Sequence, residues 1–239
     1  MQERPILLIF DVDGTLTDSA GLTRVAYEKA FIDIYSIANS TKNINPYGLT
    51  DPLIFREILK NCNLTEDGFN EQFNRFSKLT SFHLKRELDL SDKPRLHNGI
   101  AHLLFKLEQN DQIYLALGTG NVELNARLKI EIHGVNKFFP VGGFADDAED
   151  RTTIIKTAYQ RASDYYKIQF SKQNTWVIGD TDHDINCGKA INANTIAVAT
   201  GVYNNEELES YNPTAVFTDF TDFKRFVNII NNNEIPHTL

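Results

Sequence analysis

Short runs of branched and aromatic residues recur along this chain, and each run stops abruptly at a small or polar residue. The first run, Ile-Leu-Leu-Ile-Phe, occupies residues 6–10. Similar runs occupy residues 113–117, 138–141, 175–178 and 195–199, with Val216 and Phe217 as a candidate sixth. Runs that are apolar throughout are typical of strands buried on both faces. Because segments with helical spacing separate them, the sequence predicts an α/β fold, with a parallel sheet that carries helices on both faces.

The helices expected between these strands cover residues 100–108, 122–132, 152–166, 184–191 and 220–231. One segment departs from the alternation: it has helical spacing without a run that predicts a strand, and we expect helices in it at 21–37, 52–62 and 71–88. Helix capping accounts for Thr50 and Asp51, which precede Pro52 at the start of the second of these helices. The chain is thus predicted to consist of a core, residues 1–18 and 91–239, and a helical insertion, residues 19–90.

The charge balance limits the partners of this chain. Lys and Arg number 24 and Asp and Glu number 32, which gives a formal net charge of −8. An acidic chain does not offer the extended basic surface that non-specific binding to nucleic acids or anionic membranes requires. No stretch approaches the roughly 18 consecutive apolar residues of a membrane span. We therefore expect neither a nucleic-acid nor a membrane partner, and an anionic substrate would need a local cation.

The two cysteines, Cys62 and Cys187, are far apart in the sequence and match no metal-binding spacing. A secreted protein of this length more often carries a denser set of disulfides. We therefore expect a reduced, cytoplasmic setting. The sequence leaves the oligomeric state open.

Acidic residues follow two of the predicted strands, at the edge where open α/β sheets bind their ligands. Asp11 and Asp13 come directly after the first strand, and their spacing places both side chains on the same side of an extended chain. Asp180 and Asp184 follow another strand. Carboxylates gathered in one crevice repel one another unless a cation neutralises them, and oxygen ligands suit Mg²⁺. The sequence therefore predicts a magnesium site.

A third strand end carries small and polar residues. Thr119, Gly120 and Asn121 follow the run at 113–117 and precede a predicted helix. A hydroxyl and free backbone N–H groups at such a position can bind an oxyanion. We expect these three residues to bind an anionic group of the substrate.

Two simpler interpretations of Asp11-Val12-Asp13-Gly14 compete with a catalytic one. In the first, the aspartates only form the turn before Gly14. In the second, they begin a calcium loop of the EF-hand type, but such a loop has its glycine at the sixth position and Gly14 would be the fourth. The spacing excludes the calcium loop.

Three sequence motifs together resemble the haloacid dehalogenase superfamily of phosphotransferases. They are Asp-Val-Asp-Gly-Thr-Leu-Thr-Asp at 11–18, Thr119 after a strand, and Gly179-Asp180-Thr181-x-x-Asp184. More closely, the chain resembles the phosphoglycolate phosphatase and β-phosphoglucomutase branch, whose members insert a helical cap between the first and second motifs. The resemblance implies a Rossmann-like parallel sheet with helices on both faces, and a helical cap at residues 19–90.

The resemblance also implies roles for individual residues. Asp11 would be the nucleophile that forms an aspartyl phosphate, and Asp13 would be the general acid and base. The hydroxyl of Thr119, with the backbone N–H groups of Gly120 and Asn121, would bind the phosphoryl oxygens.

For the metal, the resemblance implies Asp11, the main-chain carbonyl of Asp13 and Asp180 as Mg²⁺ ligands, with Asp184 as an indirect partner. The family also uses a cation, commonly a lysine, beside the nucleophile. The usual Lys-Pro before the third motif is absent here, and Asp150-Arg151-Thr152 stands in its place, with Lys156 one turn further on. We favour Arg151 over Lys156 for this position, and we expect Lys156 to bind the substrate.

These residues predict an Mg²⁺-dependent phosphoric monoester hydrolase that resembles phosphoglycolate phosphatase and acts on a small phosphorylated substrate. A phosphomutase of the β-phosphoglucomutase type would use the same two aspartates, so the motifs leave this alternative open. A non-catalytic binding protein on the same fold is a third interpretation. Dehalogenation is disfavoured because that branch lacks the second acidic residue, which is present here as Asp13.

Overall fold

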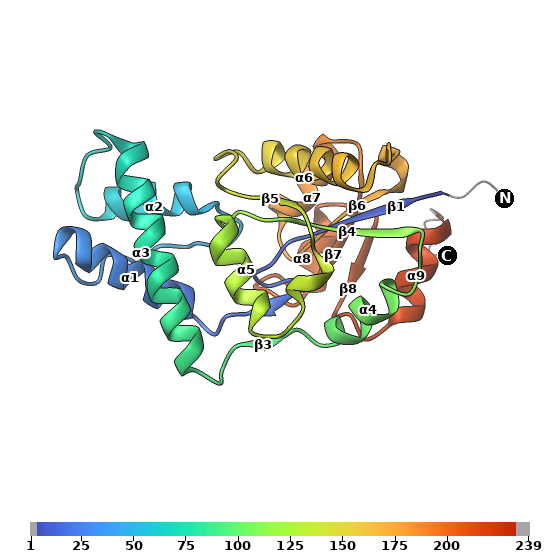
Figure 1. Ribbon diagram of the computed structural model, residues 1–239, viewed down its shortest axis with the longest axis horizontal. Coiled ribbons are helices and arrows are strands. Elements are labelled where there is room, and N and C mark those ends of the chain that lie inside the picture. Colours follow the sequence, from blue (N-terminus) through green and yellow to red (C-terminus); the bar gives the residue numbers. More distant parts are fainter. Residues whose placement is uncertain (1–3, 233–239) are drawn as a thin grey trace.

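The computed structural model describes residues 4–232 and contains a six-stranded sheet with helices against both faces (Figure 1). Its strand order is β5-β4-β1-β6-β7-β8, and every neighbouring pair is parallel. The strands are β1 (Ile6–Phe10), β4 (Ile113–Gly118), β5 (Gly142–Gly143), β6 (Thr175–Gly179), β7 (Asn194–Val198) and β8 (Ala215–Phe217). The predicted α/β class is confirmed, and β1 lies inside the sheet between β4 and β6.

The two faces of the sheet bury different residues of the same strand. In β1, Leu8 and Phe10 join one apolar cluster, whereas Leu7 and Ile9 join another. The first cluster includes residues of α4, α5 and α9, and the second includes residues of α6 and α7. These helices are α4 (Ile100–Leu107), α5 (Glu123–Glu131), α6 (Arg151–Tyr166), α7 (Asp182–Ala190) and α9 (Phe223–Asn232). Burial on both faces explains why β1 is apolar at every position.

Three further helices lie between the first strand and the rest of the sheet in the chain order. They are α1 (Leu22–Tyr35), α2 (Asp51–Asn61) and α3 (Phe69–Leu90), and they extend away from the sheet on the left of Figure 1. They share an apolar cluster of their own in which Phe55 is fully buried and its ring meets those of Phe31 and Phe76. The helical character predicted for this segment is confirmed.

One predicted strand is wrong. Residues 138–141 do not form a strand: a short 3-10 helix, η1, covers Asn136–Phe138, and β5 follows at Gly142–Gly143. The apolar pattern arises because Phe139 is buried and packs its ring 5.8 Å from that of Phe10. Glycines form the strand instead because α6 passes close by, and a Cβ at Gly143 would lie 2.1 Å from the carbonyl oxygen of Ile154. Glycine weakens strands in general, so propensity favours the wrong segment.

Several short elements were not predicted, among them the 3-10 helix η2 (Lys172–Asn174). The strands β2 (Thr17–Asp18) and β3 (Arg95–Leu96) form a separate antiparallel pair on either side of the segment that contains α1, α2 and α3. The helix α8 (Asn205–Ser210) begins at a capping box formed by Asn204 and Glu207. The sequence predicts that the three asparagines at 231–233 fray; Asn231 and Asn232 are the last residues of α9, and Asn233 lies outside the described residues.

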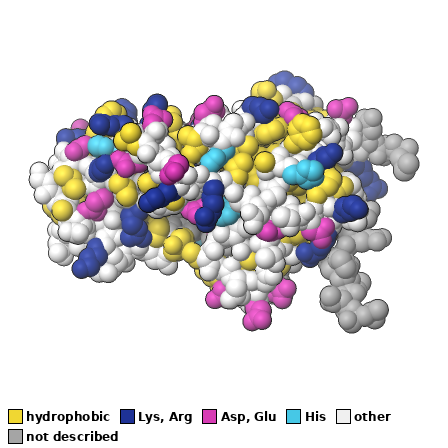
Figure 2. Space-filling view, turned by 90° about the horizontal axis from the view of Figure 1, so that it is seen from below, with side chains coloured by type: hydrophobic (Ala, Val, Ile, Leu, Met, Phe, Trp, Pro, Cys, Tyr) yellow, Lys and Arg dark blue, Asp and Glu magenta, His cyan; other side chains and the backbone are white. Residues whose placement is uncertain are grey.

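The surface mixes both signs of charge. On the face shown in Figure 2, Lys and Arg side chains are interspersed with Asp and Glu instead of forming one continuous patch. Among residues 4–232, no helix combines the length and the apolar character needed to cross a bilayer. The expectation that nucleic acid is not a partner stays a prediction.

The apolar cluster of α1 to α3 predicts a site-specific loss of stability. We expect Phe55→Ala to lower the free energy of unfolding by about 3–5 kcal/mol, because it opens a cavity where the ring meets four other rings. Phe82→Ala on α3 is the control, since Phe82 is 54% exposed and its loss should cost less than about 0.5 kcal/mol. Urea unfolding of both variants is the measurement, and equal midpoints would contradict this view of the cluster.

Candidate active site

The three motifs meet at one edge of the sheet because their strands are neighbours. The register pairs Phe10 at the end of β1 with Leu117 on β4 and with Ile178 on β6. Asp11 continues this alignment, since its backbone N–H donates to the carbonyl of Ile178 at 2.9 Å. Thr119 and Asp180 therefore flank Asp11.

Three buried carboxylates form the centre of the site. Asp11, Asp180 and Asp184 are 5%, 4% and 1% exposed, and one oxygen of each lies within 4.8 Å of the others. Asp184 is oriented locally, because its Oδ2 accepts hydrogen bonds from the backbone N–H and the hydroxyl of Thr181 in the capping box of α7. Gly14 has a φ of 73°, and a Cβ there would lie 2.3 Å from Asp180 Oδ2. Only glycine leaves room for Asp180 in this arrangement.

Arg151 is the cation of this cluster. Its Nη2 lies 2.9 Å from Asp11 Oδ2 and 2.6 Å from Asp184 Oδ1, and its side chain is 8% exposed. The guanidinium also donates to the carbonyl of Gly48, in the segment that precedes α2, at 3.1 Å. Lys156, the other cation considered from the sequence, is exposed on α6 and does not line the cavity. Of the two, the structure brings only Arg151 to Asp11.

Burial and mutual repulsion raise the pKa values of the carboxylates. Burial is the main cause that raises the pKa of Asp11 to about 6, with Arg151 opposing it and Asp184 adding to it. The pKa of Asp180 lies well above 3.8, first because of burial and then because of Asp184 and Asp11. Burial alone would lower the pKa of Arg151, but the charges of Asp11 and Asp184 outweigh it and raise this pKa. A further cation at this cluster would relieve the repulsion.

Asp13 lies in a different environment from Asp11. Its side chain is 42% exposed and lines the cavity. Its Oδ2 accepts hydrogen bonds from Asn121 Nδ2 at 2.8 Å and from Lys129 Nζ at 2.6 Å. Asn121 Nδ2 also donates to the hydroxyl of Thr119 at 2.9 Å. The residues that follow β4 are thus connected directly to Asp13.

Lys129 was not predicted as a site residue. It lies near the end of α5 with 1% exposure, and its position on an ordinary helix gives no signal in the sequence. Its neighbours Ala126 and Ile130 on the same helix do not indicate a polar site either, because both belong to the apolar core. Only the packing of α5 beside the end of β1 shows that this lysine contacts Asp13.

Thr50 is the N-cap residue of α2, as the sequence predicts, but the side chains of Thr50 and Asp51 make other contacts. The hydroxyl of Thr50 donates to the carbonyl of Glu149 at 3.0 Å and makes no cap hydrogen bond. Asp51 is 3% exposed and accepts hydrogen bonds from the Tyr27 hydroxyl at 2.5 Å and from the backbone N–H of Val122 at 2.8 Å. Both side chains therefore attach α2 to the core instead of capping the helix.

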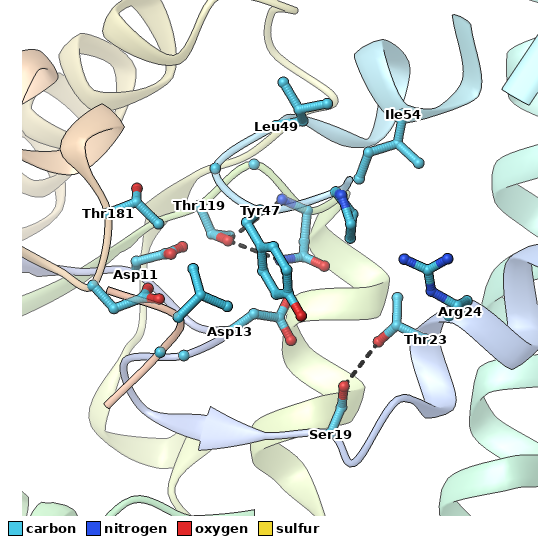
Figure 3. A pocket seen from close by; sticks show the side chains of 18 of the residues that line it. Asp11, Asp13, Ser19, Thr23, Arg24, Tyr47, Leu49, Ile54, Thr119 and Thr181 are labelled. Carbon is cyan, nitrogen blue, oxygen red and sulfur yellow. Dashed lines mark hydrogen bonds between the residues drawn. The ribbon is translucent and has the colours of Figure 1, made fainter. Parts of the chain in front are cut away.

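A cavity of about 370 Å³ connects these groups. The close view in Figure 3 shows Asp11, Thr119 and Thr181 on one side of it, Thr23 and Arg24 on the other, and Asp13 and Tyr47 between. Gly120 and Asn121 also line it. The guanidinium of Arg24 donates to the carbonyls of Thr41 and Ile44, each at 2.7 Å. The helical segment and the sheet thus enclose one site together.

This arrangement matches that of a known family. The sequence profile of the haloacid dehalogenase-like hydrolases matches residues 8–198, from β1 to the end of β7. The chain belongs to this family. The pyrophosphatase PpaX of Oceanobacillus iheyensis is 26% identical to this haloacid dehalogenase-like hydrolase over 222 residues, which cover 90% of this chain and 93% of that protein.

Solved structures share the fold over nearly the whole chain. A β-phosphoglucomutase from Clostridium difficile has a TM-score of 0.73 and 21% identity, with 98% of this chain and 99% of that chain covered. A protein described as a predicted phosphoglycolate phosphatase from Haemophilus somnus has a TM-score of 0.70 and 17% identity, with 95% and 99% covered. The family resemblance drawn from the motifs is confirmed.

The raised pKa of Asp11 predicts a pH dependence of stability in protein freed of divalent cations. The folded state keeps Asp11 protonated up to about pH 6, whereas the unfolded chain releases this proton near its ordinary value of 3.8. Its contribution to stability is full below 3.8 and is lost as the pH rises to about 6, at about 1.4 kcal/mol per pKa unit. Asp11→Asn cannot ionise and should lack this loss.

The measurement is urea unfolding of the wild type and Asp11→Asn in the presence of a chelator, at several values between about pH 4 and about pH 7. We expect the stability difference to grow in favour of the variant as the pH rises through this range. Curves that stay parallel would contradict the assigned environment of Asp11.

Proposed function

We propose that this haloacid dehalogenase-like hydrolase is an Mg²⁺-dependent phosphatase that cleaves a small phosphate monoester through an aspartyl phosphate. The observation that carries the proposal is the contrast between two carboxylates of one strand end. Asp11 is buried against Arg151, whereas Asp13 is 42% exposed and held by Asn121 and Lys129. Two carboxylates in unlike environments are suited to unlike roles.

In the first step, a carboxylate oxygen of Asp11 attacks phosphorus, and the bond between phosphorus and the ester oxygen breaks. Asp13 gives its proton to that leaving oxygen. In the second step, Asp13 takes a proton from water as the water oxygen attacks the phosphorus of the aspartyl phosphate. The bond to Asp11 breaks, inorganic phosphate leaves, and Asp11 and Asp13 return to their starting states.

Thr119 and Arg151 are proposed to bind the phosphoryl group. The hydroxyl of Thr119 lowers the pKa of Asp11, and the two residues line the same cavity. The backbone N–H groups of Gly120 and Asn121 lie at the same cavity wall. Arg151 offsets negative charge on Asp11 and, as the reaction proceeds, on the transferred oxygens. We do not assign a substrate contact to Lys156, because its side chain is exposed outside the cavity.

The residues present fit a bound Mg²⁺. Asp11 Oδ1 is buried and has no hydrogen-bond partner among the described residues, and Asp180 and Asp184 add two more carboxylates within reach. We propose Asp11, the Asp13 carbonyl and Asp180 as ligands, with Asp184 supporting the site. Carboxylate oxygens are the donors that Mg²⁺ prefers, and when bound the ion would supply positive charge to the phosphoryl oxygens.

We further propose that residues 19–90 act as a cap over the core of residues 1–18 and 91–239. Their helices have a separate apolar cluster and contribute one wall of the cavity, through residues such as Arg24, Tyr47 and Ile54. A cap of this kind excludes water from the first step and binds the leaving group. The volume of about 370 Å³ suits a small ester.

Phosphoryl transfer to a sugar hydroxyl is the second candidate function. It is supported by the similarity in fold to a β-phosphoglucomutase, with a TM-score of 0.73. The named activities of the relatives also include pyrophosphate hydrolysis. Products followed by phosphorus NMR separate the candidates: a phosphatase releases inorganic phosphate in step with substrate loss, whereas a mutase converts glucose 1-phosphate to glucose 6-phosphate with little phosphate released.

Removal of the nucleophile tests the reaction. We expect Asp11→Asn to fold and to lose at least about 10³-fold in kcat on phosphate monoesters, equivalent to roughly 4 kcal/mol in the barrier. The control is Asp164→Asn on α6, where the side chain is exposed and away from the cavity. Phosphate release across a panel of monoesters is measured beside thermal unfolding. A loss of less than about tenfold in Asp11→Asn would reject the nucleophile assignment.

The proposed metal site predicts a binding effect that does not depend on turnover. Mg²⁺ should raise the thermal midpoint of the wild type, by the equivalent of about 2.7 kcal/mol when free Mg²⁺ is ~100 times its dissociation constant. Asp180→Asn should reduce this shift and remove activity, and it should stabilise the metal-free protein because it takes one buried charge from the cluster. Full activity of chelated wild type, or an equal Mg²⁺ shift in the variant, would contradict the site.

A further inference from the structure

Lys129 is a fully buried cation beside the active site. Its side chain is 1% exposed, and its Nζ lies 2.6 Å from Asp13 Oδ2 and 2.6 Å from Asn121 Oδ1. A buried ammonium is stable only where acceptors and negative charge surround it. The carboxylate of Asp13 supplies negative charge and an acceptor, and Asn121 Oδ1 supplies a second acceptor.

A second carboxylate acts on Lys129 from the helical insertion. Asp51, the first residue of α2, is buried, and burial raises its pKa while the charge of Lys129 is the largest effect that opposes the rise. Asp51 is fixed in turn by Tyr27 on α1 and by the backbone N–H of Val122. Lys129 thus contacts a carboxylate of the core, Asp13, and interacts electrostatically with a carboxylate of the insertion, Asp51.

The two carboxylate oxygens of Asp13 differ in the hydrogen bonds that they accept. Oδ2 receives the hydrogen bonds of both Lys129 and Asn121, at 2.6 Å and 2.8 Å. Within residues 4–232, Oδ1 accepts no side-chain hydrogen bond, although Asp13 lines the cavity. Rotation of the carboxylate would break two charge-assisted contacts at once.

Lys129 itself does not reach the substrate space. It is absent from the residues that line the cavity, whereas Asp13 and Asn121 are among them. Its effect on a bound ester therefore passes through other side chains. This separates Lys129 from Arg151, which lines the same cavity and contacts Asp11 directly.

We propose that Lys129 is a positioning residue for Asp13, which holds Oδ2 so that Oδ1 faces the oxygen that gains or loses a proton. The inference rests on the proposed phosphatase mechanism, in which Asp13 is the acid and base. General acid and base catalysis contributes about 10²–10⁴-fold, and only where the geometry is correct. Without Lys129, Asp13 keeps its chemistry but loses its orientation.

The experiment compares two leaving groups in Lys129→Met, which keeps the length of the side chain and removes its charge. An alkyl phosphate needs a proton on its leaving oxygen, whereas p-nitrophenyl phosphate releases a stable phenolate. In single-turnover measurements with Mg²⁺, we expect the first step to slow by at least about 10²-fold on the best alkyl phosphate of the panel and by less than about tenfold on p-nitrophenyl phosphate. KM should change little, because Lys129 touches no substrate.

A double-mutant cycle with Asp13→Asn supplies the second readout. If Lys129 acts through Asp13, Lys129→Met should slow the reaction little further in the Asp13→Asn background. Equal losses on both leaving groups, or the same loss with and without Asp13, would overturn the proposal. If Lys129→Met does not fold, Lys129→Gln and the double variant provide the same comparisons, since the double variant leaves no lysine charge unpaired at Asp13.

Two controls keep this test separate from the test of the phosphatase mechanism. Lys156→Met removes an exposed cation outside the cavity and should leave both rates unchanged. Wild type that releases phosphate, together with inactive Asp11→Asn, establishes the mechanism before Lys129 is tested. If the wild type releases no phosphate, or if Asp11→Asn stays active, the mechanism is rejected. If both results are as expected but Lys129→Met slows both leaving groups equally, only the positioning role is rejected.

Discussion

The arrangement at the end of the sheet depends on one arginine that offsets buried carboxylates. Asp11, Asp180 and Asp184 lie within 4.8 Å of one another, and Arg151 pairs with two of them. Like charges in a buried site repel strongly, so the cluster requires cationic compensation. The same crowding requires glycine at position 14, because a Cβ there would lie 2.3 Å from Asp180 Oδ2, and the left-handed φ of 73° favours glycine as well.

The two aspartates of the first motif pair with cations from helices on opposite faces of the sheet. Arg151 begins α6, whose apolar residues cover one face of the sheet, and contacts Asp11. Lys129 belongs to α5, whose apolar residues join the cluster on the other face, and contacts Asp13. The insertion is attached to both layers. Asp51 accepts a hydrogen bond from the backbone N–H of Val122, just before α5, and the hydroxyl of Thr50 donates to the carbonyl of Glu149, just before α6. The contacts of Thr50 and Asp51 therefore hold one wall of the cavity against the two helices that carry Arg151 and Lys129.

Local patterns in the sequence were sufficient for most of the fold and for the residues at the strand ends. Strands buried on both faces are apolar at every position, so β1, β4, β6 and β7 were evident. The pattern failed at β5, where α6 approaches so closely that only glycines fit. It failed again at Asp51, because a helix start and a buried docking residue look the same in a sequence.

The parallel α/β class, the helices between the first strand and the rest of the sheet, and the carboxylates at the strand ends can all be recognised in the sequence alone, because periodicity and spacing are local properties of the chain. Which cations reach these carboxylates depends on the tertiary structure. Arg151 and Lys156 lie five positions apart on one helix, yet one faces Asp11 and the other faces solvent. Lys129 meets Asp13 across 116 positions of the chain. Such contacts depend on how whole helices rotate and pack against the sheet, and no local pattern records that rotation.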